Sequence, residues 1–345
     1  MGSLSFRTML ALTWQRYHHE SLDTTYHRAS GDRQVSDISA STPRIGVIGL
    51  GAMGRGTATA LLEQGLAVTG CDVSAQARNA FEAEGGRCAA TPAELAAHCD
   101  IVLLVVVNAD QVEQVLFGDH GLVGALAPGR VVLQCATVAP STARRFGQRL
   151  AAAGLEMLDA PISGGAAKAR AGQLSVMASG APAAFDKAAP ALDGMAATVY
   201  RLGDEAGIGS SMKLVNQLLA GVHIATAAEA MALGIRMGLD PDTVYEVITH
   251  SAGNSWMFEN RVPHILKGDY TPLSAVDIFV KDLNIVHDTG RELAMPTPVT
   301  ASALQQFTAA KGAGFGREDD AAVIKVYQRL SGIALPEAAN DDGEA

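Results

Sequence analysis

The sequence predicts an α/β protein in which an N-terminal Rossmann domain, built on a doubly wound parallel sheet, is followed by an all-α domain. Short apolar runs alternate with helical patterns from residue 44 to about 203, as expected when crossover helices join parallel strands. The run at 101–107 is apolar at every position, which is typical of a strand covered on both faces. After Gly203 only helical spacing remains.

The elements follow in order along the chain. Strands are predicted at 44–48, 67–71, 101–107, 131–135, 156–159, 174–178 and near 198–202. The helices between them are predicted at 52–64, 75–84, 92–98, 110–116 and 141–153. A long helix follows, and then shorter ones, at 209–238, 241–251, 255–264, 274–291, 298–310 and 319–330. The long helix would link the two domains and form one wall of the cleft between them, and such clefts are common ligand sites.

The predicted domains are 43–205 and 206–334, with a loose acidic tail at 335–345. Residues 1–42 differ in composition from the rest, and only the stretch 9–14 is apolar. No small-residue cleavage site follows that stretch, which argues against a secretory signal. The segment is interpreted as a disordered extension, or as the product of a start codon placed too far upstream.

Composition excludes several classes of protein. The chain has 26 basic and 36 acidic side chains, so its net charge of −10 argues against nucleic acid or an anionic membrane as a partner. No apolar run approaches the roughly 20 residues that span a bilayer. The four cysteines lack metal-ligand spacing, no metal site is expected, and the thiols fit a cytoplasmic protein.

A glycine-rich turn follows the first strand. Gly49, Gly51 and Gly54 form a Gly-x-Gly-x-x-Gly pattern between a strand and a helix, where a dinucleotide site requires it. The first glycine allows the tight turn, the second lets a pyrophosphate approach the backbone, and the third lets the helix pack on the strand. Free N–H groups at the helix start would face the phosphates. The turn as a whole, Gly49, Leu50, Gly51, Ala52, Met53 and Gly54, is predicted to bind the cofactor.

Asp72 ends the second strand, 21 residues after Gly51, about where a dinucleotide fold places a ribose-binding carboxylate. A carboxylate accepts hydrogen bonds from both ribose hydroxyls and repels a 2′-phosphate. Since no arginine immediately follows, NAD is favoured over NADP. The alternative is that Asp72 only caps the next turn or helix.

Two further segments carry candidate polar groups. Residues 159–165 follow a strand and include Ser163, Gly164 and Gly165, a possible backbone nest for a carboxylate, although an ordinary loop fits equally well. In the long helix, Lys213, Asn216 and Gln217 share one face, because residues three and four positions apart are neighbours. A lysine buried in a cleft can serve as a general acid/base once its pKa falls towards neutrality. Taken alone, Lys213 and Lys281 also fit solvated surface charges.

Taken together, these blocks resemble a known family. The chain is similar to the β-hydroxyacid dehydrogenases, which include 3-hydroxyisobutyrate dehydrogenase and tartronate semialdehyde reductase, over about 44–333. The matching blocks, in order, are the turn 49–54, the loop 159–165, the segment 207–217 and the run 281–283. The resemblance implies an NAD-dependent dehydrogenase acting on a small hydroxy acid, and a homodimer or homotetramer.

The resemblance also implies roles for individual residues. Lys213 would be the catalytic acid/base. Ser163, Gly164 and Gly165 would hold the substrate carboxylate, with Asn216 and Gln217 orienting the lysine or the substrate. Lys281, from the helical domain, would contact the cofactor, and so would Val106, Val107 and Thr137 at the ends of the third and fourth strands. The chain departs from the family at Gln217, where many members have a second asparagine.

Several stretches (107–111, 218–223 and 252–261) resemble the branch of the family that oxidises L-threonate. The resemblance implies oxidation at C2 to a 2-oxo-tetronate. A four-carbon polyhydroxy acid agrees with the polar groups Gln217, His223, Asn254 and Asn260. His223 fits equally well as a core histidine, and Trp256 and Phe258 as core anchors.

Other functions remain open. Within the family, the alternatives are a 3-hydroxyisobutyrate dehydrogenase and a reductase of tartronate or succinic semialdehyde. An imine reductase is disfavoured by Lys213, which that related group usually lacks. A cofactor-sensing protein or chromatin reader that lost catalysis is disfavoured by Lys213 and by the intact loop at Ser163, and this acidic chain has no basic reader module.

Overall fold

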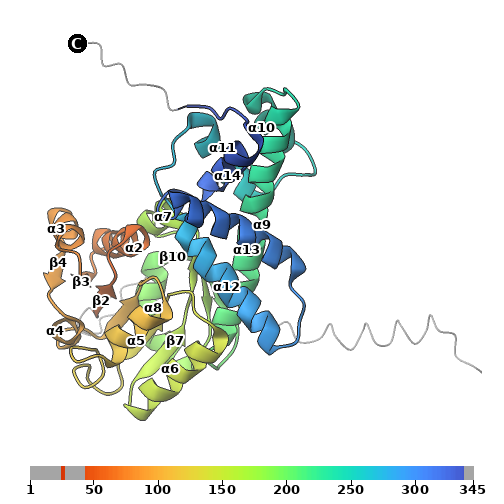
Figure 1. Ribbon diagram of the computed structural model, residues 1–345. Helices are drawn as coiled ribbons and strands as arrows, with labels where there is room; N and C mark the ends of the chain where they lie inside the picture. Colours follow the sequence, from red (N-terminus) through yellow and green to blue (C-terminus); the bar gives the residue numbers. More distant parts are fainter. Residues whose placement is uncertain (1–24, 28–42, 338–345) are drawn as a thin grey trace, which may run out of the picture.

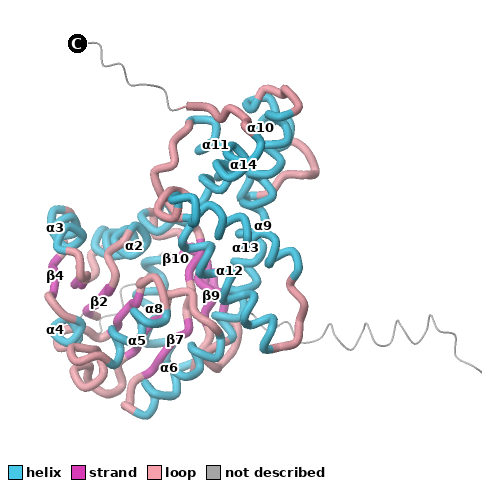
Figure 2. Tube along the Cα trace, in the orientation of Figure 1, coloured by secondary structure: helices cyan, strands magenta, loops and turns pink. Residues whose placement is uncertain are grey.

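The computed structural model describes residues 25–27 and 43–337. A sheet with helices on both of its faces occupies one end of the molecule, and a group of helices occupies the other (Figures 1 and 2). The α/β fold class predicted from the sequence is therefore confirmed. The two parts meet along one long helix, α9 (Ile208–Arg236), which leaves the sheet region and runs through the helical region.

The main sheet has six strands, all parallel, in the order β4-β3-β2-β5-β6-β7. The strands are β2 (Arg44–Ile48), β3 (Ala67–Cys71), β4 (Arg87–Ala89), β5 (Ile101–Leu104), β6 (Val131–Gln134) and β7 (Glu156–Asp159). From β2 the chain adds β3 and β4 on one side of the sheet and then β5, β6 and β7 on the other, so the switch point lies between β2 and β5. A ligand of a doubly wound sheet binds in the crevice outside the carboxyl ends of the strands at this switch point.

Successive residues of the central strands enter two different cores, because side chains alternate between the faces of a strand. Val47 and Leu103 pack with α2 (Ala52–Glu63) and α8 (Pro182–Met195). Ile48 and Leu104 pack on the other face, towards α4 (Pro92–Ala96), α5 (Ala109–Phe117) and α6 (Pro140–Ala152). Burial on both faces explains why these strands read as continuous apolar runs.

A second sheet has the order β1-β10-β9-β8. Its strands are β1 (Thr25–His27), β8 (Ile162–Ser163), β9 (Leu174–Ala178) and β10 (Ala196–Arg201). β9 and β10 are parallel to each other, whereas β8 and β1 are antiparallel to their neighbours. The last two strands predicted from the sequence therefore belong to this smaller sheet and do not extend the parallel one.

Several helices start at a residue whose side chain accepts a hydrogen bond from a first-turn backbone N–H, which satisfies a donor that the helix leaves unpaired. Ser74 caps α3 (Ala75–Ala83), Asp240 caps α10 (Pro241–Thr249) and Ser255 caps α11 (Trp256–Lys267). Thr91 and Asn108 cap α4 and α5 in the same way. These local signals explain why most helix starts were predicted to within a few residues.

The helical part is built around α9. Helices α11, α12 (Val276–Glu292), α13 (Pro298–Ala310) and α14 (Ile324–Ser331) pack against it, around a core that includes Met231, Phe279 and Phe307. Two short turns, η1 (Lys311–Phe315) and η2 (Asp320–Val323), connect α13 to α14. Figure 1 shows α12 and α13 beside α9.

By length and composition alone, α9 is apolar enough to cross a membrane, with a mean hydropathy of 1.6 over its most apolar 18-residue window. The sequence analysis did not foresee a run of this kind. Half of that window is buried within the protein. The central helix of a water-soluble core passes the same test, so α9 is weak evidence for a membrane span.

The structure describes a small part of each predicted end of the chain. Residues 25–27, inside the segment interpreted as a disordered extension, form strand β1 on β10, and the rest of 1–42 lies outside the described residues. Of the predicted tail, 335–337 is described and has no regular secondary structure.

Candidate active site

The glycine turn connects β2 to α2 as predicted, and two of its glycines are required by the chain itself. Gly49 has φ of 95°, a left-handed conformation that favours glycine. A Cβ on Gly54 would lie 1.7 Å from the carbonyl oxygen of Gly49, so only glycine lets α2 pack this closely on the turn.

Gly51 is different. Its φ of −64° and ψ of −174° suit any residue, and a Cβ placed there would have no protein atom within 4 Å. Neither backbone conformation nor internal packing therefore requires glycine at 51. The open space above it lies at the N-terminus of α2, where a phosphate is electrostatically favoured. The residues present thus fit a dinucleotide whose pyrophosphate approaches the backbone at this point.

Asp72 follows β3 and lies beside the same turn. Its Oδ2 accepts a hydrogen bond of 2.7 Å from the backbone N–H of Leu50, and its Oδ1 accepts one of 2.7 Å from Ser74. Arg78 donates to the carbonyl oxygen of Asp72 and so steadies this corner. The carboxylate is partly exposed and each of its oxygens keeps a lone pair, which suits it to accept from ribose hydroxyls.

The other predicted cofactor residues lie at the same edge of the sheet. Val106 and Val107 follow β5, which ends at Leu104, earlier than the predicted 107. Val107 is half exposed. Thr137 follows β6, and its carbonyl oxygen accepts a hydrogen bond of 3.4 Å from Lys281 Nζ of α12. Lys281 thus reaches across from the helical part to the carboxyl ends of the strands.

Lys213 lies in the second turn of α9 and is only 7% exposed. Burial lowers the pKa of its amine to about 8, while the nearby Asp282 carboxylate raises that pKa and Lys281 lowers it. Lys213 Nζ donates a 2.8 Å hydrogen bond to the carbonyl oxygen of Ile162. A neutral amine oriented in this way still has a lone pair to accept a proton, as a general base requires.

The start of α9 is attached to the end of β7. Asp159 is fully buried, and its carboxylate accepts hydrogen bonds from the N–H groups of Gly207 and Ser210 and from the Ser210 hydroxyl, at 2.7–2.8 Å. Ser179 Oγ accepts another from the N–H of Gly209, at 2.9 Å. Burial raises the pKa of the Asp159 carboxyl above its usual value, and the hydrogen bonds from Ser210 and Gly207 offset only part of that rise. The attachment sets the position of Lys213, one turn after Ser210.

The Ser163 loop closes the other side of Lys213. Ser163 ends the short strand β8, which pairs with β9, and the helix α7 (Gly165–Arg170) begins two residues later. Gly164 and Gly165 have φ of 136° and 76°, conformations that L side chains rarely adopt. Neither β8 nor α7 was predicted from the sequence.

Asn216 and Gln217 lie one turn after Lys213. Asn216 Nδ2 donates a 3.0 Å hydrogen bond to Gln217 Oε1, and Gln217 Nε2 donates to Asp282 Oδ2 of α12. Asp282 is almost completely buried and pairs with Lys281. Both ends of the Gln217 amide are therefore engaged within the protein.

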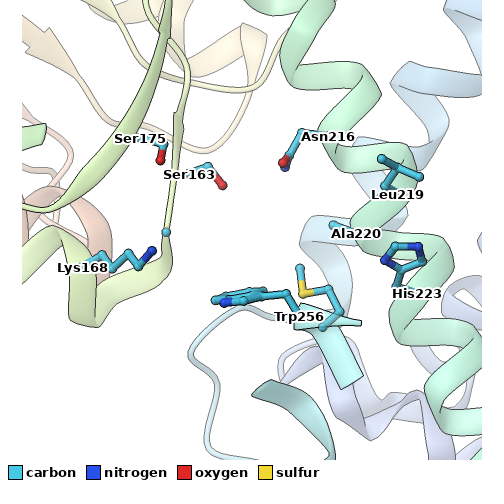
Figure 3. A pocket seen from close by; sticks show the side chains of 10 residues that line it. Ser163, Lys168, Ser175, Asn216, Leu219, Ala220, His223 and Trp256 are labelled. Atoms are coloured by element: carbon cyan, nitrogen blue, oxygen red, sulfur yellow. The ribbon is translucent and has the colours of Figure 1, made fainter. Parts of the chain in front are cut away.

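A pocket of about 240 Å³ separates the Ser163 loop from α9. Ser163 and Asn216 face one another across it (Figure 3). Its lining is Ser163, Gly164, Lys168, Ser175, Asn216, Leu219, Ala220, His223, Trp256 and Met257. Lys213 is absent from this lining, because its amine is turned towards Ile162.

The sequence analysis did not single out Lys168 or Ser175, and it left His223 and Trp256 open. His223 lies two turns beyond Asn216 on α9, and Trp256 begins α11; both line the pocket, and neither is buried in the core, because His223 is partly exposed and Trp256 is half exposed. Asn254 and Asn260, considered as polar contacts, do not line it; they bond instead to Thr249, Glu259 and Arg261.

The cysteines do not contribute a nucleophile to this pocket. Cys71, Cys99 and Cys135 are buried, and burial raises the pKa of each thiol, to about 11 for Cys71 and about 12 for the other two. Such thiols are protonated at neutral pH and unreactive. Among residues 25–27 and 43–337, no three His, Cys, Asp or Glu side chains gather as a metal site needs.

A parallel sheet that carries a glycine turn and an acid at its switch point, together with a buried lysine beside a pocket, defines a dinucleotide-dependent oxidoreductase. Comparison with known proteins agrees. The model of the NAD binding domain of 6-phosphogluconate dehydrogenase matches residues 44–203. The model described as NAD-binding of NADP-dependent 3-hydroxyisobutyrate dehydrogenase matches 207–327.

Individual relatives match most of the chain. L-threonate dehydrogenase of Cupriavidus necator is 58% identical over 292 residues, 85% of this chain and 97% of that protein. The Escherichia coli CFT073 enzyme of the same name is 51% identical over 296 residues, 85% of this chain and 97% of that protein. A crystal structure described as 3-hydroxyisobutyrate dehydrogenase from Salmonella typhimurium is 51% identical, with a TM-score of 0.79, covering 82% of this chain and 99% of that one. The chain belongs to the 3-hydroxyisobutyrate dehydrogenase family of NAD-dependent hydroxyacid dehydrogenases.

Proposed function

We propose that this protein oxidises L-threonate at C2 to the 2-oxo-tetronate 2-dehydro-L-erythronate, with NAD as the acceptor and Lys213 as the general acid/base. The observation that carries the mechanism is the buried amine of Lys213, which bonds to the carbonyl of Ile162 beside the pocket that Ser163 and Asn216 line. The choice of substrate rests on the relatives at 51–58% identity named L-threonate dehydrogenase.

Six turn residues and five others would hold NAD: Gly49, Leu50, Gly51, Ala52, Met53, Gly54, Asp72, Val106, Val107, Thr137 and Lys281. When bound, NAD supplies the hydride acceptor for the carbon that loses its hydrogen. Lys281, which pairs with Asp282, would contact the cofactor at the end of β6, where it bonds to the carbonyl of Thr137. The dinucleotide phosphates would lie at the N-terminus of α2, which carries a partial positive charge.

The protein's own groups position the substrate and move the proton. Backbone N–H groups at Ser163, Gly164 and Gly165 would bind the substrate carboxylate. Neutral Lys213 accepts the proton of the C2 hydroxyl as the carbonyl forms. Asn216 and Gln217 orient the lysine or the substrate from the adjoining turn of α9.

Substrate identity is tested with a panel of L-threonate, D-threonate, D-erythronate, 3-hydroxyisobutyrate and D-glycerate, each assayed by reduction of NAD and of NADP. We expect turnover confined to L-threonate with NAD. The crystal structure named 3-hydroxyisobutyrate dehydrogenase, at 51% identity, makes that acid the second candidate. Preference for 3-hydroxyisobutyrate or D-glycerate would keep the family and replace the proposed substrate.

Replacing Asp72 with alanine is expected to weaken NAD binding by about 1–3 kcal/mol, the loss typical of hydrogen bonds to a charged group. The NAD-to-NADP preference should also fall, because the repulsion of a 2′-phosphate is removed. Dissociation constants from fluorescence titration with each cofactor measure both effects. Asp119→Ala, in an exposed loop, serves as the control. An unchanged cofactor preference in Asp72→Ala would show that Asp72 only supports the turn.

The pH dependence follows from Lys213, whose pKa is about 8. Oxidation needs the neutral amine as base, so its rate should rise as pH passes through about 8 and level off above it. Reduction of the 2-oxo acid needs the protonated amine, so its rate should fall over the same range. Initial rates in both directions between pH 6 and 10 measure this, and parallel profiles in the two directions would contradict the assignment.

We also propose the division into an NAD-binding domain at 43–205 and a helical domain at 206–334, and a cytoplasmic protein that forms a homodimer or homotetramer. Exposed apolar side chains on α9, among them Met212, Val215 and Leu233, support self-association. Light scattering coupled to gel filtration tests the oligomer, and a monomer at micromolar concentration would exclude it.

A further inference from the structure

Gln217 is engaged at both ends of its amide and does not line the pocket. Its Oε1 accepts a 3.0 Å hydrogen bond from Asn216, and its Nε2 donates to the carboxylate of Asp282. The side chain is 7% exposed. Asn216 lines the pocket, whereas Gln217 does not. These contacts differ from those of a residue that binds substrate directly.

Asp282 links Gln217 to the cofactor side of the site. It is 1% exposed, with one oxygen facing Gln217 and the other paired with Lys281. Lys281 Nζ also donates to the carbonyl of Thr137 after β6. A continuous chain of hydrogen bonds therefore connects Asn216, Gln217, Asp282, Lys281 and Thr137, and it joins α9 and α12 to the edge of the main sheet.

The same carboxylate acts on Lys213. The charged groups that act on the Lys213 amine are Asp282 and Lys281, both on α12, with opposite effects on its pKa. From the sheet side, the Lys213 amine bonds to the uncharged carbonyl of Ile162. Because the interaction between charges in a buried site depends steeply on distance, the position of Asp282 matters to the protonation of Lys213.

We propose that Gln217 is a positioning residue rather than a substrate contact: it holds the Asn216 amide towards the pocket and holds Asp282 in place relative to Lys213. This refines the proposed function and rests on its assignment of Lys213. Side-chain length supports the inference. Asparagine is one methylene shorter than glutamine and would not bond to both Asn216 and Asp282 from the same place on α9.

The test compares Gln217→Asn, Gln217→Glu, Asp282→Asn and the double variant Gln217→Asn/Asp282→Asn, using the best substrate of the panel. We expect Gln217→Asn to lower kcat by about 10- to 100-fold with KM changed less than about twofold, because misplaced catalytic groups reduce turnover. The double variant should lose much less than the product of the two single losses, because both substitutions break one link.

The glutamate variant has a signature in its pH profile. A second carboxylate near Lys213 stabilises the charged amine, so the rising limb for oxidation should move to higher pH in Gln217→Glu. In Asp282→Asn the loss of the negative charge should move it to lower pH. Asn284→Asp, on the exposed side of α12, is the matched control and should leave the limb in place. Thermal melts identify any variant that fails to fold. If the charged variant Gln217→Glu does not fold, kcat and KM of the uncharged variant Gln217→Asn still test the inference.

Two results overturn the inference: a rise in KM with kcat and the pH limb unchanged, as expected of a substrate contact, or independent effects of Gln217→Asn and Asp282→Asn. Failure of the proposed function is seen separately. If Lys213→Ala keeps normal activity, the acid/base assignment fails, whatever the Gln217 variants do. If Lys213→Ala is inactive and Gln217→Glu changes only KM, the positioning role alone is wrong.

Discussion

Lys213→Ala is expected to reduce turnover by about 10²- to 10⁴-fold, the usual contribution of a positioned acid/base. The amine is buried, its pKa is lowered to about 8, and its hydrogen bond to Ile162 sets its orientation. Removing it leaves no described lysine at the same place, since Lys281 is paired with Asp282 and Lys168 lines the pocket from α7. The loss should fall mainly on kcat, because the pocket lining itself is unchanged.

Two further variants show whether the loss is specific to the Lys213 amine. Lys213→Met keeps the length and the apolar stem, so it should fold like the parent and be as inactive as the alanine variant. Lys267→Ala, an exposed lysine at the end of α11, should be fully active. Steady-state rates at pH 9, where the parent amine is mostly neutral, give the comparison. Near-normal turnover in Lys213→Met would remove Lys213 from the mechanism.

The second large effect is expected at the glycine turn, where substitution of Gly51 and substitution of Gly54 should differ in their effects on stability and on NAD binding. Gly51→Val places a side chain in space that no protein atom occupies, so stability should be nearly unchanged while NAD affinity falls by at least about 100-fold, or about 2.8 kcal/mol. Gly54→Ala forces a Cβ against the carbonyl of Gly49, so this variant should lose stability as well as NAD binding.

Thermal melting with and without NAD separates the two. Gly51→Val should melt with the parent in the absence of NAD and show no upward shift when NAD is added, since a ligand stabilises only the state that binds it. Gly54→Ala should melt several degrees lower from the start. Gly65→Ala is a useful control for strain alone, because its φ is 80° and no ligand is expected there. Normal NAD binding by Gly51→Val would show that the cofactor does not approach the turn.

The part of the fold that sequence predicted is the part with local signals. Glycines, caps and fully apolar runs marked most helices and every strand of the parallel sheet except the edge strand β4, which has only three residues and no apolar run. α8 was missed because Pro190 and Gly194 interrupt its pattern, although Pro182 opens the helix favourably. The two-residue strand β8 is too short to show a period. Whether β9 and β10 join the main sheet or a second one depends on distant pairing, which no local pattern encodes.

The candidate site also has a part that the sequence predicted and a part that it did not. Lys213 and the Ser163 loop belong to recognisable sequence motifs, and the structure brings them together. The partner of Gln217 is Asp282, 65 positions away, so a sequence could not show that the amide is already engaged. Lys168 and Trp256 enter the pocket from α7 and α11, and nothing local to either residue marks it as a pocket residue.

The attachment of α9 to the end of β7 has a consequence for how substrate range can change. Asp159, Ile162 and Ser163 belong to one five-residue segment that anchors α9, orients the Lys213 amine and lines the pocket. The far wall carries Trp256 and Met257 of α11, a helix that makes none of those bonds. Substitutions in the far wall can therefore change which acids the pocket accepts without changing the geometry of proton transfer. Substrate range can thus evolve, or be redesigned, separately from the catalytic step.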